Sequence, residues 1–298
     1  MRCASSRFIW RMICRKAFQV AEPKLNRAMA KVNGINLFYR DTLSGDQTIL
    51  CLHGRWGRGE TWTDLIARYR DRYRIIAPDQ RGHGLSDKPI ARYAGEDMAT
   101  DAYELIQHLG CAPVIVVGHS MGARIGAYLT ARYPQVVKAF ALLDCGASGP
   151  AQRAEKPPEQ IPAIDELTRD WQTPYPTYDD ALRDLQQRFR ATGARYFADS
   201  LYETVDGYDF LFSRYSIAAI VEYAQDWHHL LPQIQCPVWF VRAKESWALS
   251  KEEADKMRPL IEHCAYFEVS NSEHMVYADN PDEFYPAFDQ FLRRIGDG

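Results

Sequence analysis

The chain has 298 residues, of which 46% are hydrophobic and 25% are charged, and its formal net charge at pH 7 is −3. These fractions are average for globular proteins and exclude the disordered and fibrous classes. No apolar run approaches the roughly 18 residues that a membrane-spanning helix requires. Beyond residue 28 the acidic side chains outnumber the basic ones, so we expect no nucleic-acid partner and no stable membrane insertion.

The N-terminal segment differs from the rest of the chain in charge, and residues 1–29 are predicted to form a basic extension. Residues 1–28 contain seven basic side chains and a single acidic one. Such a segment could be an organelle-targeting peptide, an amphipathic helix that binds a surface, or a poorly ordered extension. The seven cysteines include no Cys-x-x-Cys motif, which favours free thiols in a reducing compartment. We expect a cytoplasmic protein, with targeting to an organelle through the basic segment as the alternative.

Short apolar segments alternate with helical patterns along much of the chain. Several of these segments, such as Val114–Val117, are apolar at every position, which is typical of strands buried on both faces of a parallel sheet. The alternation predicts an α/β fold with a doubly wound, mostly parallel sheet of about eight strands. The expected strands are Ile35–Asp41, Thr48–His53, Tyr73–Pro78, Val114–Gly118, Lys138–Asp144, Pro237–Arg242 and Ala265–Ser270. Helices are expected near residues 60–70, 96–109, 120–133, 251–262 and 281–295.

Residues 146–234 interrupt the alternation. Helical patterns are expected throughout this segment, at Ile164–Trp171, Tyr178–Phe189 and Ser213–Leu231. The segment is far longer than an ordinary connection between two strands. We therefore predict a helical cap at residues 146–234, inserted into one core that consists of residues 30–145 and 235–298.

A motif for nucleophilic catalysis follows the predicted strand Val114–Gly118. The residues Gly118-His119-Ser120-Met121-Gly122 have the form Gly-x-Ser-x-Gly, and a helical pattern begins directly after them. In a sharp turn from strand to helix, the serine hydroxyl is exposed and the two glycines leave room for the turn. The N-terminus of the following helix favours developing negative charge. Ser120 is therefore predicted to be a nucleophile.

This turn and two further motifs resemble the α/β-hydrolase superfamily, over about residues 30–296. Leu52-His53-Gly54 resembles the family's His-Gly turn, and residues 79–87 (Asp-Gln-Arg-Gly-His-Gly-Leu-Ser-Asp) resemble its motif after the fourth strand. The motifs occur in the order that the family shows. The resemblance implies an oxyanion hole formed by the backbone N–H groups of Arg55 and Met121.

The resemblance also implies that an acid and a histidine base follow Ser120 in the chain. His274 is the expected base because it follows the last predicted strand. The acid is expected in the turn after Pro237–Arg242, where the family more often has aspartate and this chain has Glu245. Asp144, at the end of the preceding strand, is the alternative. A carboxylate in this position holds the imidazole in the tautomer that accepts the serine proton.

The predicted activity is that of a serine hydrolase that cleaves a small carboxylic ester, lactone or thioester through an acyl-enzyme on Ser120. Trp56 and Trp247 are expected to contact this small-molecule substrate. Neither a metal nor a cofactor is expected, since no ligand spacing for either occurs. Carbon–carbon bond hydrolysis, a lyase reaction like that of the menaquinone-pathway synthase, and cofactor-free perhydrolase activity are alternatives on the same residues. A non-enzymatic ligand receptor is a further alternative, and the sequence does not indicate an oligomeric state.

Overall fold

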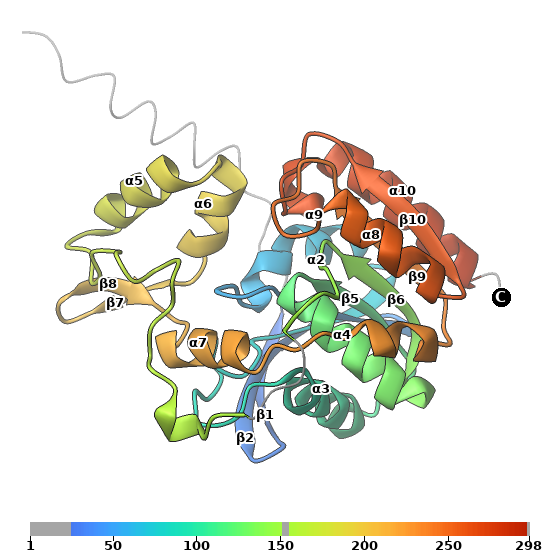
Figure 1. The fold of residues 1–298 in the computed structure, drawn as a ribbon, viewed down its shortest axis with the longest axis horizontal. Coiled ribbons are helices and arrows are strands. Elements are labelled where there is room, and N and C mark those ends of the chain that lie inside the picture. Colours follow the sequence, from blue (N-terminus) through green and yellow to red (C-terminus); the bar gives the residue numbers. More distant parts are fainter. Residues whose placement is uncertain (1–24, 151–154, 297–298) are drawn as a thin grey trace, which may run out of the picture.

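The computed structural model describes residues 25–150 and 155–296, and its core is an eight-stranded sheet with helices on both faces (Figure 1). The strands lie in the order β1-β2-β4-β3-β5-β6-β9-β10. β1 and β4 pair antiparallel with β2, and all other neighbours are parallel. The predicted fold class is therefore confirmed. The strands are β1 (Asn26–Val32), β2 (Ile35–Asp41), β3 (Gln47–Leu52), β4 (Tyr73–Pro78), β5 (Val114–His119), β6 (Val137–Leu143), β9 (Val238–Ala243) and β10 (Cys264–Val269).

β5 lies near the centre of the sheet, and all of its residues are buried. Its side chains alternate between two apolar clusters, because successive residues of a strand point to opposite faces. One cluster includes α3 and α4, and the other includes α2 and α10. The core helices are α2 (Thr63–Tyr69), α3 (Gly95–Leu109), α4 (Met121–Arg132), α8 (Lys251–Met257), α9 (Val276–Asp279) and α10 (Pro281–Gly296).

Two of the core helices are shorter than expected. The helix expected near residues 60–70 begins as a 3-10 turn at Gly59–Trp62 before α2. The helix expected at 251–262 ends with α8 at Met257 and continues as a 3-10 turn that contains Pro259, because proline disrupts the hydrogen bonding of an α-helix. Across the described ranges, no helix combines the length and the apolar character needed to cross a membrane.

The sheet begins earlier in the chain than the sequence analysis expected. β1 starts at Asn26, inside the segment 1–29 that was interpreted as an extension, and pairs with β2 from Asn26↔Asp41 to Val32↔Ile35. Asn33 and Gly34 connect the two strands with positive φ angles of 44° and 78°. Asn-Gly is the preferred sequence for a two-residue hairpin turn of this kind, so the signal was present. The targeting and surface-binding hypotheses concern residues 1–28, of which residues 1–24 lie outside the described residues.

The segment between β6 and β9 forms the insertion, which lies to one side of the sheet (Figure 1). Its helices are α5 (Tyr178–Arg188), α6 (Ala191–Ala198) and α7 (Arg214–Glu222). The expectation that it is helical throughout is wrong, because β7 (Leu201–Thr204) and β8 (Gly207–Phe210) form an antiparallel hairpin.

Two expected helices of the insertion differ from the structure for local reasons. Residues 166–170 form turns instead, and the Asp165 carboxylate before them accepts hydrogen bonds from the backbone N–H and the hydroxyl of Thr168. Such local bonds compete with helix formation. The helix expected at 213–231 ends at Glu222, and the N–H of Trp227 instead donates to the carbonyl of Ala147.

Candidate active site

Ser120 lies in a tight turn between β5 and α4, as the sequence predicts. Its φ and ψ angles are 53° and −118°, a backbone conformation that costs energy for a residue with a side chain. A Cβ atom on Gly118 would lie 2.4 Å from the carbonyl oxygen of Gly122, and one on Gly122 would lie 2.1 Å from that of Leu52. Only glycine therefore fits at these two positions.

His274 is oriented by Asp144. The Nδ1 atom of His274 donates a hydrogen bond to Oδ2 of Asp144 over 2.7 Å, and both side chains are buried. Asp144 directly follows β6 and is itself held by two donors, the backbone N–H of Ala243 at 2.8 Å and the hydroxyl of Ser246 at 2.6 Å. An imidazole held in this way presents an unprotonated Nε2, which can accept a proton from a hydroxyl.

The expectation that Glu245 contacts the imidazole is wrong. Its Oε2 atom accepts the backbone N–H of Ser272 at 2.8 Å, and its own N–H donates to the Ser272 carbonyl at 2.9 Å. Glu245 thus fastens the loop that carries His274 but does not touch the ring. The alternative residue, Asp144, makes that contact because β6 lies between β5 and β9 in the sheet, so its C-terminal end lies close to both Ser120 and the loop after β9.

Two residues outside the sequence motifs brace this site. The Oδ2 atom of Asp279 accepts hydrogen bonds from the backbone N–H groups of Glu273 and Met275, each at 3.1 Å. Together with Glu245, it holds both sides of the His274 loop. Ser246 is the second residue, through its hydroxyl contact with Asp144. Neither residue belongs to a recognisable motif, because these contacts depend on the folded loops.

The two residues expected to supply the amides of the oxyanion hole line the same space as Ser120. Met121 is the first residue of α4, so its N–H has no acceptor within the helix. The N–H of Arg55 donates to no atom of the described residues. Both residues line one cavity together with Ser120. The role of these amides stays a prediction.

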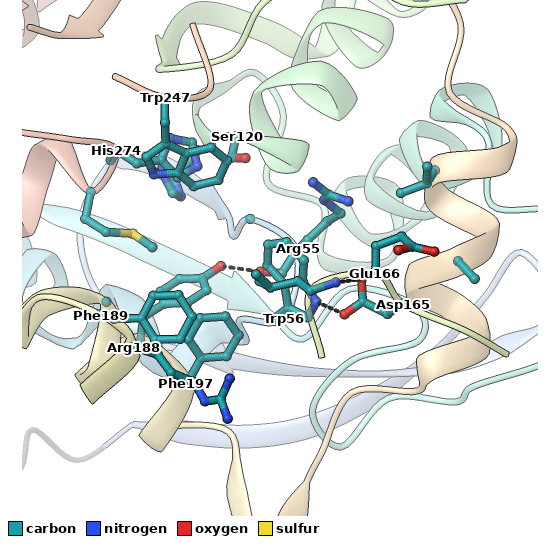
Figure 2. Close-up of a pocket in the computed structure, with 18 of the residues that line it drawn as sticks. Arg55, Trp56, Ser120, Asp165, Glu166, Arg188, Phe189, Phe197, Trp247 and His274 are labelled. Atoms are coloured by element: carbon teal, nitrogen blue, oxygen red, sulfur yellow. Dashed lines mark hydrogen bonds between the residues drawn. The ribbon is translucent and has the colours of Figure 1, made fainter. Parts of the chain in front are cut away.

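The site opens into a cavity of about 980 Å³ between the core and the insertion. Figure 2 shows Trp247 beside His274 at one end of this cavity, and the two rings lie with centroids 4.4 Å apart and planes tilted by 49°. Trp247 is 64% exposed. Trp56 is buried, and its Nε1 donates to Asp165 at 2.8 Å. The other walls combine aliphatic residues such as Ile161, Leu167 and Val221 with the aromatic and charged residues Arg188, Phe189, Arg190, Tyr196 and Phe197.

Buried neutral imidazoles support the loops beneath the site. His53 donates from Nδ1 to the Gly54 carbonyl at 2.8 Å and accepts the Gln80 N–H at Nε2 at 2.9 Å. His83 donates to the carbonyl of Arg81. Burial lowers the pKa of each of these two histidines to about 3.

The two imidazoles should make stability depend on pH. In the unfolded chain each histidine binds a proton below about pH 6.5, whereas in the folded protein it stays neutral down to about pH 3. The free energy of unfolding should therefore fall as the pH drops below 6.5, by about 2 kcal/mol per imidazole at pH 5. Urea unfolding at pH 7.5 and pH 5 measures the loss. The loss should be smaller in His83→Asn, and an equal loss in the variant would contradict the assignment.

Comparisons with known proteins agree with this fold. A family model described as "alpha/beta hydrolase fold" matches residues 47–281. The chain is 29% identical to 2-(acetamidomethylene)succinate hydrolase of Mesorhizobium japonicum over 265 residues, which cover 88% of this chain and 93% of that protein. The chain belongs to the α/β-hydrolase family and is a member of this class of hydrolytic enzymes.

Solved structures add to the comparison. A crystal structure of E-2-(acetamidomethylene)succinate hydrolase superposes with a TM-score of 0.79 at 26% identity and covers 90% of this chain and 99% of its own. The enol-lactonase from Burkholderia xenovorans superposes with a TM-score of 0.69 at 22% identity, covering 89% and 100%, which reflects the shared fold. Within the described ranges, no group of three or more histidine, cysteine, aspartate or glutamate side chains could hold a metal ion.

Proposed function

We propose that this protein is a serine hydrolase that cleaves a small carboxylic ester, lactone or thioester through an acyl-enzyme on Ser120. The observation that carries the proposal is the hydrogen bond that His274 donates to Asp144, since His274 lines the same cavity as Ser120. This contact supports a site in which Ser120 is the nucleophile, His274 the base and Asp144 the orienting acid. The three residues follow three different strands, β5, β10 and β6. In this proposal Asp144 replaces Glu245 as the acid.

The proposed reaction has two halves. Ser120 attacks the substrate carbonyl while Nε2 of His274 takes the hydroxyl proton, and the amides of Arg55 and Met121 stabilise the oxyanion. His274 then returns the proton to the leaving group, which departs and leaves the acyl-enzyme. In the second half, water loses a proton to His274 and attacks the acyl-enzyme; His274 then returns the proton to the oxygen of Ser120 as the acid is released. Asp144 keeps the imidazole in the required tautomer throughout.

A small amide is the second candidate substrate. The relative that matches over 265 residues is named for a compound that carries an acetamido group. The same nucleophile and base can cleave an amide if the leaving nitrogen receives the proton from His274. Trp56 and Trp247 would form walls for either substrate, since both line the cavity.

We also propose a cytoplasmic location. The five cysteines within the described residues are all free thiols, and free thiols persist in reducing compartments.

Labelling with a fluorophosphonate probe tests the proposed function. The purified protein should react at Ser120, located by mass spectrometry of the digested protein, because only an activated serine attacks such a probe quickly. It should also hydrolyse members of a panel of p-nitrophenyl esters, a lactone, a thioester and an anilide. Heat-denatured protein is the control. A folded protein that neither reacts with the probe nor hydrolyses any member of the panel would contradict the proposal.

A further inference from the structure

A second cavity lies beside Ser120. It has a volume of about 340 Å³, and its lining includes Arg55, Ser120, Met121 and Arg124; we call it the arginine cavity. Arg55, Ser120 and Trp247 also line the large cavity, so the two spaces meet at the nucleophile. A substrate whose carbonyl sits at Ser120 could therefore extend one short arm into the arginine cavity.

Arg124 lines this cavity, and its guanidinium has donor groups that lack a good hydrogen-bond acceptor among the described residues. It lies four residues after Ser120, and residues with this spacing share one face of a helix. Its Nε atom is buried and has no hydrogen-bond partner in the described part of the chain. Its Nη2 atom donates only a long hydrogen bond, of 3.5 Å, to the carbonyl of Ile220. Burial lowers the pKa of Arg124, as expected for a charged group removed from water without a counterion.

Arg55 is a second cation without an ion pair among residues 25–150 and 155–296. Its guanidinium lies 4.5 Å from the centre of the Trp56 ring. Burial lowers the pKa of Arg55 and the positive charge of Arg124 lowers it further, whereas the nearby carboxylate of Asp165 raises it. Other basic residues of the large cavity have acidic partners: Lys156 with Glu222, Arg188 with Asp184, and Arg190 with Glu273.

Within residues 25–150 and 155–296, no carboxylate forms an ion pair with Arg55 or Arg124, although the charges of Asp165 and Glu96 act on them from further away. The acidic residue that lines the arginine cavity is Asp144. Its Oδ1 accepts from Ala243, and its Oδ2 accepts from Ser246 and His274. Two neighbouring half-buried cations repel each other, whereas an anion placed between them would form charge-assisted hydrogen bonds with both.

We infer that Arg55 and Arg124 form a carboxylate subsite, so that the substrate is an anionic ester or amide with a carboxylate on a short arm next to the scissile carbonyl. This inference rests on the proposed function, because it assumes that the substrate carbonyl meets Ser120. Arginine suits the task, since its planar fork can donate two parallel hydrogen bonds to one carboxylate.

A pair of matched substrates tests the inference. p-Nitrophenyl hydrogen succinate carries a carboxylate on a two-carbon arm, and p-nitrophenyl pentanoate carries an apolar end of similar length. After subtraction of the uncatalysed rates, the ratio of kcat/KM for the anionic over the neutral ester should fall at least about 10-fold in Arg124→Gln. Arg124→Lys should retain part of the preference. Arg132→Gln, an exposed residue of the same helix, should keep the ratio of the unmodified protein.

The unmodified protein provides a test that does not depend on how the variants fold. Its preference for the anionic ester should weaken several-fold when sodium chloride is raised from about 0.05 to 0.5 M, because salt screens the attraction. A preference that is independent of salt, or a ratio that changes less than 2-fold in Arg124→Gln, would overturn the inference.

Binding to the inactive Ser120→Ala protein separates this inference from the proposed function. Succinate should bind at least about 10-fold more tightly than succinamide by calorimetry, and Arg124→Gln should remove the difference. Hydrolysis of the neutral ester without preferential succinate binding would overturn the subsite and leave the serine hydrolase intact. Succinate binding that depends on Arg124, in a protein that hydrolyses nothing, would support the subsite and contradict the proposed function.

Discussion

Replacing Ser120 with alanine should lower the hydrolytic rate at least about 10³-fold without unfolding the protein. The hydroxyl is the only group lost, and methyl is small enough for the strained turn, whose φ of 53° is set by β5 and α4. With no nucleophile, catalysis would be limited to what the oxyanion amides and His274 achieve with water. The rate is measured with the best ester of the panel, and folding is measured by circular dichroism and thermal unfolding.

Two controls make the result specific. Ser44→Ala changes an exposed serine whose hydroxyl bonds to backbone carbonyls far from the cavity, and it should leave the rate unchanged. Fluorophosphonate labelling should disappear in Ser120→Ala and persist in Ser44→Ala. Activity within a few-fold of the unmodified protein in a folded Ser120→Ala variant would contradict the nucleophile assignment.

The parts of the site that sequence could predict are those encoded by continuous residues. The buried strand, two glycines and following helix around Ser120 occupy one short segment, and steric limits on each glycine explain the pattern. His274 could be predicted for a similar reason, because it follows the last predicted strand and the base comes last in the family's chain order. The same continuity explains why the strands of the parallel sheet could be recognised from their apolar runs.

The acid could not be chosen in this way because its position depends on neighbouring strands. Asp144 follows β6 and Glu245 follows β9, and both strands end at the same edge of the sheet. Either carboxylate was therefore compatible with the chain order. The local contacts of each carboxylate decide between them. The backbone N–H of Ser272 holds the side chain of Glu245. The turn at Asp144, where φ is 48°, directs the Asp144 side chain toward the imidazole of His274.

The two hairpins carry only short local signals in the sequence. The Asn33-Gly34 turn predicts the β1–β2 hairpin, but the basic charge of the preceding residues suggested an extension. In the insertion, β7 and β8 are only four residues long each, too short for a clear alternating pattern. Both hairpins depend on turn residues rather than on hydrophobic periodicity.

Replacing Asp144 with asparagine should lower kcat on the order of 10⁴-fold and change KM much less. The amide oxygen of asparagine can still accept the Ala243 N–H, but its NH₂ group would then face Nδ1 of His274. The imidazole would take the other tautomer, with the proton on Nε2, and could no longer accept the Ser120 proton. Steady-state kinetics with one ester measures both constants, and thermal unfolding checks that the variant folds.

Glu245→Gln is the matched comparison, because glutamine also keeps an oxygen that can accept the Ser272 N–H. We expect kcat to stay within about 10-fold of the unmodified protein, since the loop retains its hydrogen bond and Asp144 still orients His274. The two variants therefore rank the two carboxylates by their effect on the reaction. If kcat fell about 10⁴-fold in Glu245→Gln and stayed nearly unchanged in Asp144→Asn, Asp144 would not be the orienting acid. Ser120 and His274 could still keep their proposed roles. A similar small effect of both substitutions would instead imply that neither carboxylate sets the tautomer of His274.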